Sequence, residues 1–419
     1  MSNWKTVKLG DVATFLKGKS LSKDDIIPNG SRECIHYGEL FTKYNENIQS
    51  VISRTSITGP LVLSRTNDVF MPTSDVTPRG LSTASYINKE GVILGGDVLI
   101  IRPDPSRLFG LFFAHYVRAN KHKIIRLVSG STVFHLYGSD LKKLQLDLPP
   151  LNEQKRIVEI LETWQEYLKE LDRKIELKKN IKKGLMQQLL TGNIRLPGFN
   201  YGWQDTTLDT YAAKKKNAIV DGPFGSQMKL SEFTRSGVPV IEMHHLKDNY
   251  IVNRMLSRYV SDDKFDKDLS RSVVYPGDII ISKTGSLGYL GLLRDVDKAI
   301  ITSRLAKISL DESNADTGFI FQYLKYMKWT GYWERVGQGG TMKILSISNF
   351  KKMPIPKLGK SEQTAITNVL DCLDDEIGLL CRGRDLINGQ KKYLVDNLIT
   401  GKIRTPEDLK IPAKEVQYA

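Results

Sequence analysis

A short pattern near the middle of the chain returns near its end, and this repeat limits the possible folds more than any other feature. Glu153-Gln154 is matched by Glu362-Gln363, and Thr191-Gly192 is matched by Thr400-Gly401. The members of each pair are 209 positions apart (362 − 153 and 401 − 192). The two segments between these ends have the same length, which predicts two equivalent elements in a tandem duplication.

Each segment carries the signals of one long helix. Asn152 and Ser361 are residue types that cap helix N-termini, and the glutamate that follows each suits the positive end of a helix dipole. Gly192 and Gly401 stand where a left-handed residue would end the helix. We therefore predict two helices of about 40 residues, each ~60 Å long.

Apolar residues inside both segments recur at alternating steps of four and three, which is a heptad pattern. This spacing favours two helices packed on each other; the alternative is an amphipathic helix packed on its own domain. Three glycines in the second segment (Gly378, Gly383 and Gly389) predict that the second helix depends on its partner. The predicted interface residues are Ile157, Leu161, Trp164, Leu168, Leu171, Ile175, Ile366, Leu370, Leu373, Ile377 and Leu380.

The region before each helix is repeated as well, although more loosely. Trp4–Leu9 resembles Trp203–Leu208, and Thr132–Lys143 resembles Thr341–Lys352. The chain is therefore predicted to read domain, helix, domain, helix, with two tandem mixed α/β domains in an α+β chain. The predicted segments are a first domain at 1–147, a first helix region at 148–197, a second domain at 198–355, a second helix region at 356–406 and a tail at 407–419.

Short β-rich runs bounded by Gly, Pro, Asn and Asp predict the strands of each domain, for example at 97–101 and 277–281. Residues 111–119 and 318–327 are predicted to form short helices. Proline cannot donate a ladder hydrogen bond, so Pro239 predicts that the run at 238–241 is at best an edge strand.

Net charge and cysteine content limit the possible partners and the compartment of the chain. The net charge of +14 and the pI near 9.4 favour a polyanionic partner, although excess lysine could also serve solubility. We expect a cytoplasmic protein, because no signal peptide or membrane span is evident and Cys34, Cys372 and Cys381 form no CxxC pair.

Several catalytic motifs are missing from the sequence. There is no GxxxxGK[ST] loop, no Asn/Asp-Pro-Pro-Tyr/Phe tetrapeptide of amino-methyltransferases, and no set of Cys and His residues with metal-ligand spacing. Glu176-Leu177-Lys178 superficially resembles half of a nuclease site, but it lies on the predicted helix and lacks a preceding Pro-Asp. We predict no catalytic residue, no metal site and no cofactor in this chain.

The remaining polar motifs suit binding, because they mostly place cations beside Gly, Ser or Thr in predicted loops. Glycine lets backbone N–H groups approach phosphates, lysine releases counterions, and Gln, Thr, Ser and Arg can read base edges. For any single loop the alternative is an ordinary exposed turn. The candidate DNA-binding residues are Lys17, Lys19, Arg79, Thr132, His135, Lys214, Lys215, Lys283, Thr284, Ser286, Gln338, Thr341 and Lys343.

These features together resemble the specificity (S) subunits of type I restriction–modification systems. The resemblance rests on the helix entries Leu148–Gln154 and Glu362-Gln363, the exits at 190–192 and 398–401, and Asp221–Ser226 at the start of the second domain. In the second entry, residues 356–363, the proline is displaced from the Glu-Gln pair, which departs from the pattern of the first copy.

The resemblance implies that each domain is a target-recognition domain that reads one half of a bipartite, asymmetric site in double-stranded DNA. It implies an antiparallel coiled coil that sets the gap between the halves and docks two modification (M) subunits. Those subunits would bring S-adenosylmethionine and methylate an adenine, and restriction (R) subunits would bring ATP and Mg chemistry. Two alternatives remain open: a stand-alone sequence-specific DNA-binding regulator, and a coiled-coil scaffold whose basic charge is incidental. The DNA target is not predicted.

Overall fold

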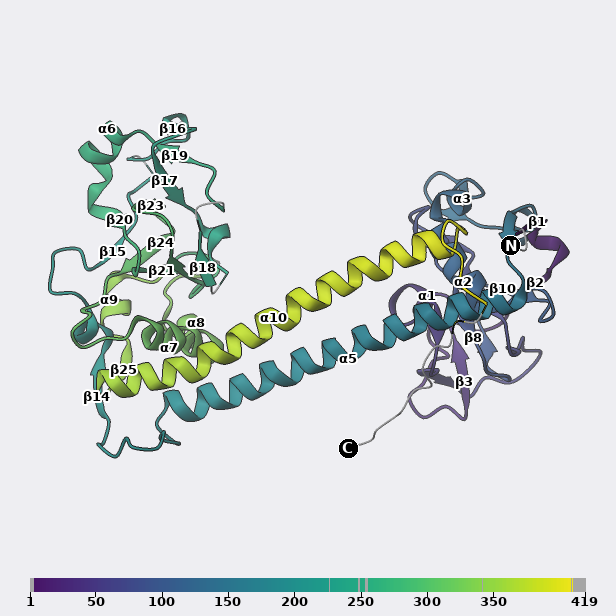
Figure 1. Cartoon of the computed structure of the whole chain (residues 1–419), viewed down its shortest axis with the longest axis horizontal. Coiled ribbons are helices and arrows are strands. Elements are labelled where there is room, and N and C mark those ends of the chain that lie inside the picture. Colours follow the sequence, from purple (N-terminus) through teal and green to yellow (C-terminus); the bar gives the residue numbers. More distant parts are fainter. Residues whose placement is uncertain are drawn as a thin grey trace. The chain divides into compact units, whose positions relative to one another are not determined.

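The computed structural model describes residues 4–225, 227–247, 249–252, 255–340, 342–407 and 409 (Figure 1). These residues form two compact units. Unit 1 comprises residues 1–172 and 382–419, and unit 2 comprises residues 173–381. Each unit therefore contains one globular domain and half of each long helix. We call the globular parts domain 1 and domain 2.

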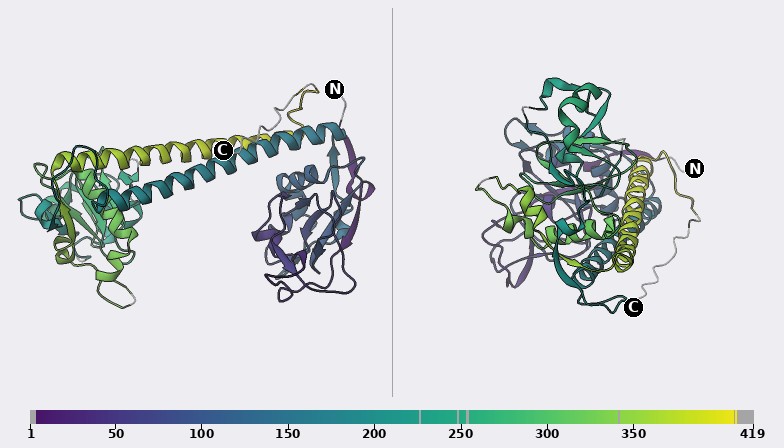
Figure 2. Two further views of the ribbon diagram at one scale, coloured as in Figure 1. Left: turned by 90° about the horizontal axis from the view of Figure 1, so that it is seen from below. Right: turned by 90° about the vertical axis from the view of Figure 1, so that its left-hand side faces the viewer.

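Two long helices, α5 (Leu151–Leu190) and α10 (Lys360–Leu398), have 40 and 39 residues. Within each unit, the segments of α5 and α10 lie side by side and run in opposite directions (Figures 1 and 2). Gly192 and Gly401 follow the helix ends with φ of 74° and 72°, which confirms their predicted left-handed conformation. No helix of the described residues is long and apolar enough to cross a membrane.

The prediction that Asn152 and Ser361 cap these helices is wrong. Both residues lie inside the first turn, because α5 begins at Leu151 and α10 at Lys360. The first intrahelical bonds go to the backbone carbonyls of Pro150 and Gly359, which accept from Gln154 and Gln363 at 3.0 and 3.1 Å. The helices start two residues earlier than caps at these positions would place them.

The heptad positions near each helix start are buried in the core of a domain. Ile157 and Leu161 of α5 join the domain 1 core, together with Leu398 from the end of α10. Ile366 and Leu370 of α10 join the domain 2 core in the same way. Further along, Leu168 and Ile175 are buried, whereas Trp164, Leu171, Leu373, Ile377 and Leu380 are half-buried. Each long helix therefore packs on a domain near its start and on the other long helix further along, so both packing modes considered from the sequence occur.

Domain 1 is built from several small sheets. Its strands are β1 (Lys5–Lys8), β2 (Ala13–Lys17), β3 (Arg32–Ile35), β4 (Asn47–Ile48), β5 (Ser53–Thr55), β6 (Val69–Pro72), β7 (Ser74–Asp75), β8 (Ser85–Ile87), β9 (Ile93–Leu94), β10 (Val98–Pro103), β11 (Ser129–Gly130), β12 (Phe134–His135) and β13 (Gln145–Leu148). The main sheet has the order β2-β10-β6-β8-β4, beside the sheets β5-β3-β9 and β11-β12-β7. Strand β1 pairs with β13, which leads directly into α5.

Domain 2 has a related plan, with two five-stranded sheets where domain 1 has one five-stranded sheet and smaller ones. Its strands are β14 (Gln204–Thr207), β15 (Ile219–Asp221), β16 (Phe233–Thr234), β17 (Val238–Ile241), β18 (Asn249–Ile251), β19 (Tyr259–Val260), β20 (Val273–Val274), β21 (Ile279–Ser282), β22 (Leu290–Leu293), β23 (Ala299–Ile301), β24 (Leu305–Ile308) and β25 (Pro354–Lys357). The sheets are β15-β24-β21-β22-β18 and β16-β19-β17-β23-β20. Strand β14 pairs with β25, which leads into α10.

Short helices complete both domains. Domain 1 has η1 (Leu9–Asp11), α1 (Glu39–Thr42), η2 (Gly80–Ser82), α2 (Gly110–Ala119), α3 (Lys121–Ile125) and α4 (Gly138–Leu141). Domain 2 has η3 (Leu208–Tyr211), η4 (Leu230–Glu232), η5 (Met243–His245), α6 (Asp262–Lys264), η7 (Phe265–Leu269), η8 (Ser270–Ser272), α7 (Thr317–Trp329), α8 (Tyr332–Val336) and α9 (Ile347–Lys351). The predicted helices at 111–119 and 318–327 correspond to α2 and α7.

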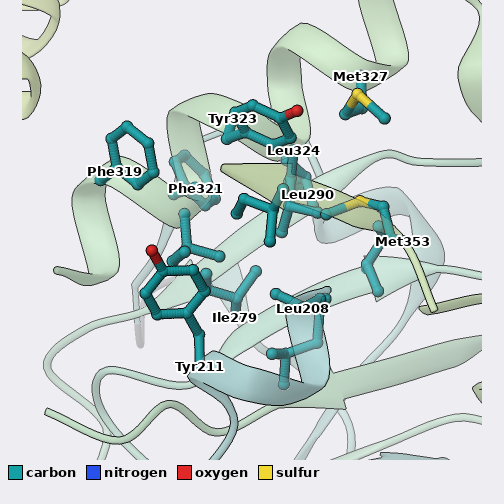
Figure 3. Packing of buried hydrophobic residues seen from close by; sticks show 14 of the residues in the cluster. Leu208, Tyr211, Ile279, Leu290, Phe319, Phe321, Tyr323, Leu324, Met327 and Met353 are labelled. Atoms are coloured by element: carbon teal, nitrogen blue, oxygen red, sulfur yellow. The ribbon is translucent and has the colours of Figure 1, made fainter. Parts of the chain in front are cut away.

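The core of domain 2 joins its first 3-10 helix to α7. Leu208 and Tyr211 of η3 lie opposite Phe319 and Leu324 of α7, with Ile279 of the sheet between them (Figure 3). All five side chains are at most 2% exposed. Burying a large apolar side chain contributes about 1.5–3 kcal/mol, so this cluster fixes α7 on the sheet.

The prediction that residues 238–241 form at best an edge strand is wrong, because β17 lies in the middle of its sheet. Val238 and Pro239 pair with β19, and pairing with β23 begins only at Val240. On the β19 side, the Val240 N–H donates to the Arg258 carbonyl at 2.9 Å. The missing N–H of Pro239 therefore falls on the side of the strand where the next ladder has not yet started.

Candidate functional site

The candidate DNA-binding residues of domain 1 gather around the small sheet β11-β12-β7. His135 of β12 pairs with Ser129 on one side and with Ser74 on the other. Thr132 is exposed in the turn between β11 and β12, after Gly130, which has φ of 113°. Arg79 is exposed in the loop that follows β7. The sheet thus joins residues that lie more than 50 positions apart in the sequence.

A cavity of about 570 Å³ opens beside this sheet, and we call it the domain 1 pocket. Lys17 lies on its wall, and its ammonium pairs with Asp97 at 3.2 Å. Lys19 is exposed two residues after the end of β2, the strand that contains Lys17. The residues that define the pocket are Phe15, Lys17, Asp97, His135, Tyr137 and Lys142.

Domain 2 brings its candidates together at the equivalent place. Ile344 forms isolated bridges with both Thr284 and Gln338. The Gly285 N–H donates to the Lys343 carbonyl at 3.2 Å, and Ser286 is exposed beside it. Thr341, another predicted contact, lies outside the described residues. Gly339, with φ of 112°, repeats the turn conformation of Gly130.

Two of the lysines predicted to bind DNA in domain 2, Lys283 and Lys343, make contacts within the protein. The Lys283 ammonium lies 3.1 Å from Asp221, which also binds Arg271 at 2.7 Å. The Lys343 ammonium donates to the backbone carbonyl of Glu334. Their roles toward DNA stay predictions, because an ion pair at a surface can exchange a carboxylate for a phosphate.

Lys214 and Lys215 do not join this group. Both are exposed in the segment that precedes β15. Asp221, which binds Lys283, is the last residue of the same strand. The structure therefore places the two lysines and Lys283 at opposite ends of β15.

A second site, which the sequence did not reveal, joins the ends of the two helices. Glu153 at the start of α5 accepts two hydrogen bonds from Arg404, which follows α10, at 2.6 and 2.7 Å. The Trp4 indole donates to the same carboxylate at 3.3 Å. The Glu153 side chain is only 4% exposed. A buried carboxylate bound bidentately by arginine is a strong and specific contact. We call this arrangement the unit 1 clasp.

Unit 2 contains an equivalent clasp. Glu362 at the start of α10 accepts from Arg195, which follows α5, at 2.6 and 2.8 Å. The Trp203 indole donates to Glu362 at 3.2 Å. Gly192 approaches the Trp203 ring so closely that a Cβ there would lie 3.0 Å from it. The available signal was the repeated arginine three residues after each glycine.

The glutamine of each helix entry ties the helix to its domain. The Gln154 side chain accepts from the Phe109 N–H at 2.8 Å and donates to the carbonyls of Arg107 and Pro149. Gln363 makes the same three bonds with Asp316, Asn314 and Leu358. Both glutamines are fully buried. The repeated Glu-Gln pair is therefore explained by two structural roles.

Charged clusters lie where the helices meet each domain. In unit 1, Glu162 of α5 accepts from Asn47 at 2.7 Å and lies 3.4 Å from His115 of α2. Burial opposes its ionisation, but the hydrogen bonds from His115 and Asn47 hold the pKa of Glu162 below its ordinary value. Lys391 of α10 donates to Gln165 of α5, and burial lowers the pKa of this lysine.

In unit 2, Lys182 of α5 lies 2.5 Å from Asp374 of α10, and Lys325 of α7 lies 3.4 Å from the same carboxylate. Gln322 of α7 donates to Asp371 at 2.7 Å and to Asp374 at 2.9 Å. Burial, together with the nearby charge of Lys325, lowers the pKa of Lys182. These contacts fix the two helices and α7 relative to one another within unit 2.

Each unit also exposes apolar side chains on its halves of the helices. Each unit has three such side chains, and they are between 42% and 64% exposed. Unit 1 has Tyr167, Leu386 and Tyr393, and unit 2 has Leu177, Ile181 and Leu379. Among the described residues, no group of three or more His, Cys, Asp and Glu side chains could hold a metal ion.

Comparison with known proteins gives a consistent result. The family model of the type I restriction modification DNA specificity domain matches residues 1–187 and 225–384. The specificity subunit of the type I restriction enzyme MjaVIII from Methanocaldococcus jannaschii is 24% identical over 96% of this chain and 93% of its own length.

Solved structures show the same fold. A chain from a structure that describes complex assembly and conformational transition of the type I R-M system has a TM-score of 0.61 and 18% identity, covering 96% of this chain and 99% of that one. The crystal structure of a type I restriction–modification S subunit from M. genitalium has a TM-score of 0.58 and 17% identity, covering 94% and 96%. The predicted fold, two mixed α/β domains with long helices, is confirmed.

Proposed function

This chain belongs to the type I restriction–modification DNA specificity family, and we propose that domain 1 and domain 2 each read one half of a bipartite DNA site. In this proposal the chain is the recognition subunit and performs no chemistry itself. The helix pair sets the gap between the half-sites. Modification subunits that dock on the chain methylate adenine, and restriction subunits complete the assembly.

One observation carries the proposal: equivalent turns in the two domains present different side chains at equivalent positions. Gly130 and Gly339 have φ of 113° and 112°, and they open turns in which His135 and Ile344 pair with two neighbouring segments each. Duplicated surfaces with different side chains suit a target of two parts with different sequences. The net charge of +14 favours the phosphate contacts that such a surface requires.

The exposed apolar residues of the helices support docking of two modification subunits, one on each unit. Three large apolar side chains in each unit, such as Tyr393 in unit 1 and Leu379 in unit 2, are more than 40% exposed. Leu386 and Tyr393 are seven positions apart on α10, and Leu177 and Ile181 are four apart on α5, so each pair lies on one helix face, which suits a protein-binding surface. Replacing Leu386 and Tyr393 by Ser should remove one bound modification subunit, and replacing Leu177 and Leu379 should remove the other. Native mass spectrometry would count them.

The decisive test is selection from a randomised DNA pool, with the chain alone and with its co-expressed modification subunit. We expect a motif of two parts with a fixed gap, sharpened by the partner. A single contiguous motif bound by the chain alone would favour a stand-alone regulator. No enrichment in either condition would contradict DNA recognition and favour a scaffold.

The spacer role has its own test. Inserting one helical turn into both α5 and α10 adds about 5.4 Å, which corresponds to one or two base pairs. The preferred gap should lengthen by that amount in the pool experiment. An unchanged gap would show that the helix pair does not set it.

A further inference from the structure

The domain 1 pocket has the composition of a ligand site rather than of a simple surface depression. Its volume of about 570 Å³ lies in the range of small-molecule sites. Leu99 and Leu136, which are almost fully buried, line its apolar part. Tyr137 stands at the wall and is 52% exposed, so its ring is accessible from solvent.

Aromatic rings give this pocket flat stacking surfaces. The His135 and Tyr137 rings are nearly parallel, at 22°, with centroids 6.0 Å apart. The Lys142 ammonium lies over the Phe15 ring, 5.7 Å from its centroid. Stacking of a base on an aromatic side chain is worth about 1–3 kcal/mol in single-stranded nucleic-acid complexes, which corresponds to about 5- to 150-fold in affinity. The pocket therefore suits a planar heterocycle.

A carboxylate at this place needs a particular explanation. Asp97 accepts from the Thr73 hydroxyl at 3.2 Å and pairs with Lys17, and its side chain is 44% exposed. A carboxylate repels phosphates, but it can accept a hydrogen bond from a base. Acidic side chains read exocyclic amino groups, which thymine lacks.

We propose that the domain 1 pocket takes one nucleobase, turned out of its stack, that carries an exocyclic amino group. Tyr137 stacks on the base, Asp97 accepts from its amino group, and Lys17 moves from Asp97 to the neighbouring phosphate. This inference rests on the proposed function, because it assigns one position of the half-site that domain 1 reads. It makes Asp97 and Tyr137 specificity-determining residues, although neither was predicted from the sequence.

The test uses the full chain with its co-expressed modification subunit and the motif recovered from the randomised pool. Fluorescent base analogues, 2-aminopurine and pyrrolocytosine, are placed in turn at each position of the domain 1 half-site. One position that excludes thymine in the pool, other than the adenine that the modification subunit methylates, should brighten on binding of the unaltered protein, because an unstacked analogue is no longer quenched. Tyr137→Ala should abolish this signal and weaken binding about 5- to 150-fold.

Asp97→Asn provides an independent readout, because an amide can donate to thymine where a carboxylate cannot. Selection with this variant should admit thymine at the same position and leave the domain 2 half-site unchanged. Tyr275→Ala is the matched control: Tyr275 is 47% exposed in a turn of domain 2 before β21. It should bind as the unaltered protein does.

The outcomes separate this inference from the proposed function. A two-part motif with no brightening except at the methylated adenine, and with the same sequence preference for Asp97→Asn, would overturn the pocket assignment and leave DNA recognition intact. Failure to recover any motif would overturn both. Brightening at a second position that persists in Tyr137→Ala would place that unstacked base elsewhere and contradict the assignment.

Discussion

The two places where the helices meet the domains use equivalent positions but different chemistry. Gln154 binds the Phe109 N–H and Gln363 binds the Asp316 N–H, so α2 and α7 are aligned with an offset of 207 (316 − 109). At this offset His115 corresponds to Gln322. In unit 1 the histidine lies near one helix carboxylate, whereas in unit 2 the glutamine donates to two.

The clasps, in contrast, are the same in both units. Each consists of a glutamate at a helix start, an arginine after the other helix and a tryptophan at the domain start. We call the contacts between α2 or α7 and the long helices the junctions. The two copies of the duplicated chain therefore share the contacts of the clasps but differ in the contacts of the junctions. Disruption of a clasp should therefore have equal effects in the two units, and disruption of a junction should not.

Arg404→Met and Arg195→Met should have the largest effects, and these should be equal. Each leaves a nearly buried glutamate without its charge partner, which costs about 3–5 kcal/mol when a buried pair is broken. Hydrogen exchange read by mass spectrometry would measure the opening free energy of each unit separately. Arg384→Met, at an exposed ion pair on α10, is the matched control and should leave the opening free energy of unit 1 unchanged. A large effect in one unit only would break the equivalence.

Lys182→Met should destabilise unit 2 more than Lys391→Met destabilises unit 1. Lys182 binds Asp374 directly, so its loss leaves that carboxylate to Lys325 and Gln322 and should cost about 1–3 kcal/mol. Lys391 donates to a neutral amide, Gln165, so its loss should cost about 1 kcal/mol. Denaturant unfolding with the same exchange readout would rank them. Equal losses of stability in the two variants would contradict the predicted difference between the two lysines.

Acid should destabilise unit 1 before unit 2. The neighbouring Arg118 and His115 keep the pKa of Glu46 below the ordinary 4.5 despite burial. The pKa of Glu162 is also below 4.5. In unit 2, Lys325 and Lys182 keep the pKa of Asp374 below 3.8 despite burial. A carboxyl group whose pKa is lower in the folded state stabilises the fold above its unfolded pKa, and this stabilisation is lost as the pH falls.

Each unit also has two exposed carboxyl groups with a lowered pKa, so the buried ones, two in unit 1 against one in unit 2, predict a larger loss for unit 1 between about pH 5 and pH 3. Cleavage by pepsin, located by mass spectrometry, would show which unit opens first. Glu162→Gln should remove part of this acid dependence in unit 1 only. Opening of unit 2 first would contradict the assignment.

The sequence predicted the elements of this molecule better than their contacts. The 209-residue repeat, the heptad steps and the left-handed Gly192 and Gly401 are local signals, and all of them correspond to observed features. The N-cap predictions at Asn152 and Ser361 put the helix starts two residues too late, since α5 begins at Leu151 and α10 at Lys360.

The clasps and the domain 1 pocket could not be derived in the same way, because their members are distant in the sequence. Glu153 and Arg404 meet only because the two helices are antiparallel, which no local pattern specifies. Lys17 and His135 were selected as candidates, but Asp97 and Tyr137 were not, since a lone aspartate and an aromatic residue show no periodicity. Only the folded sheets bring these four side chains to one cavity.

The smallest predicted effect exchanges the two residues that differ between the junctions. His115→Gln should change the stability of unit 1 by at most ~1 kcal/mol, because the amide can donate to Glu162 as Gln322 donates to Asp371. Gln322→His should cost more in unit 2, since one ring nitrogen cannot serve two carboxylates at 2.7 and 2.9 Å. Exchange protection of α2 and α7 would measure both. Equal and small costs would mean that Asp374 is held by its lysines alone, and that the chemical difference between the junctions has little effect on stability.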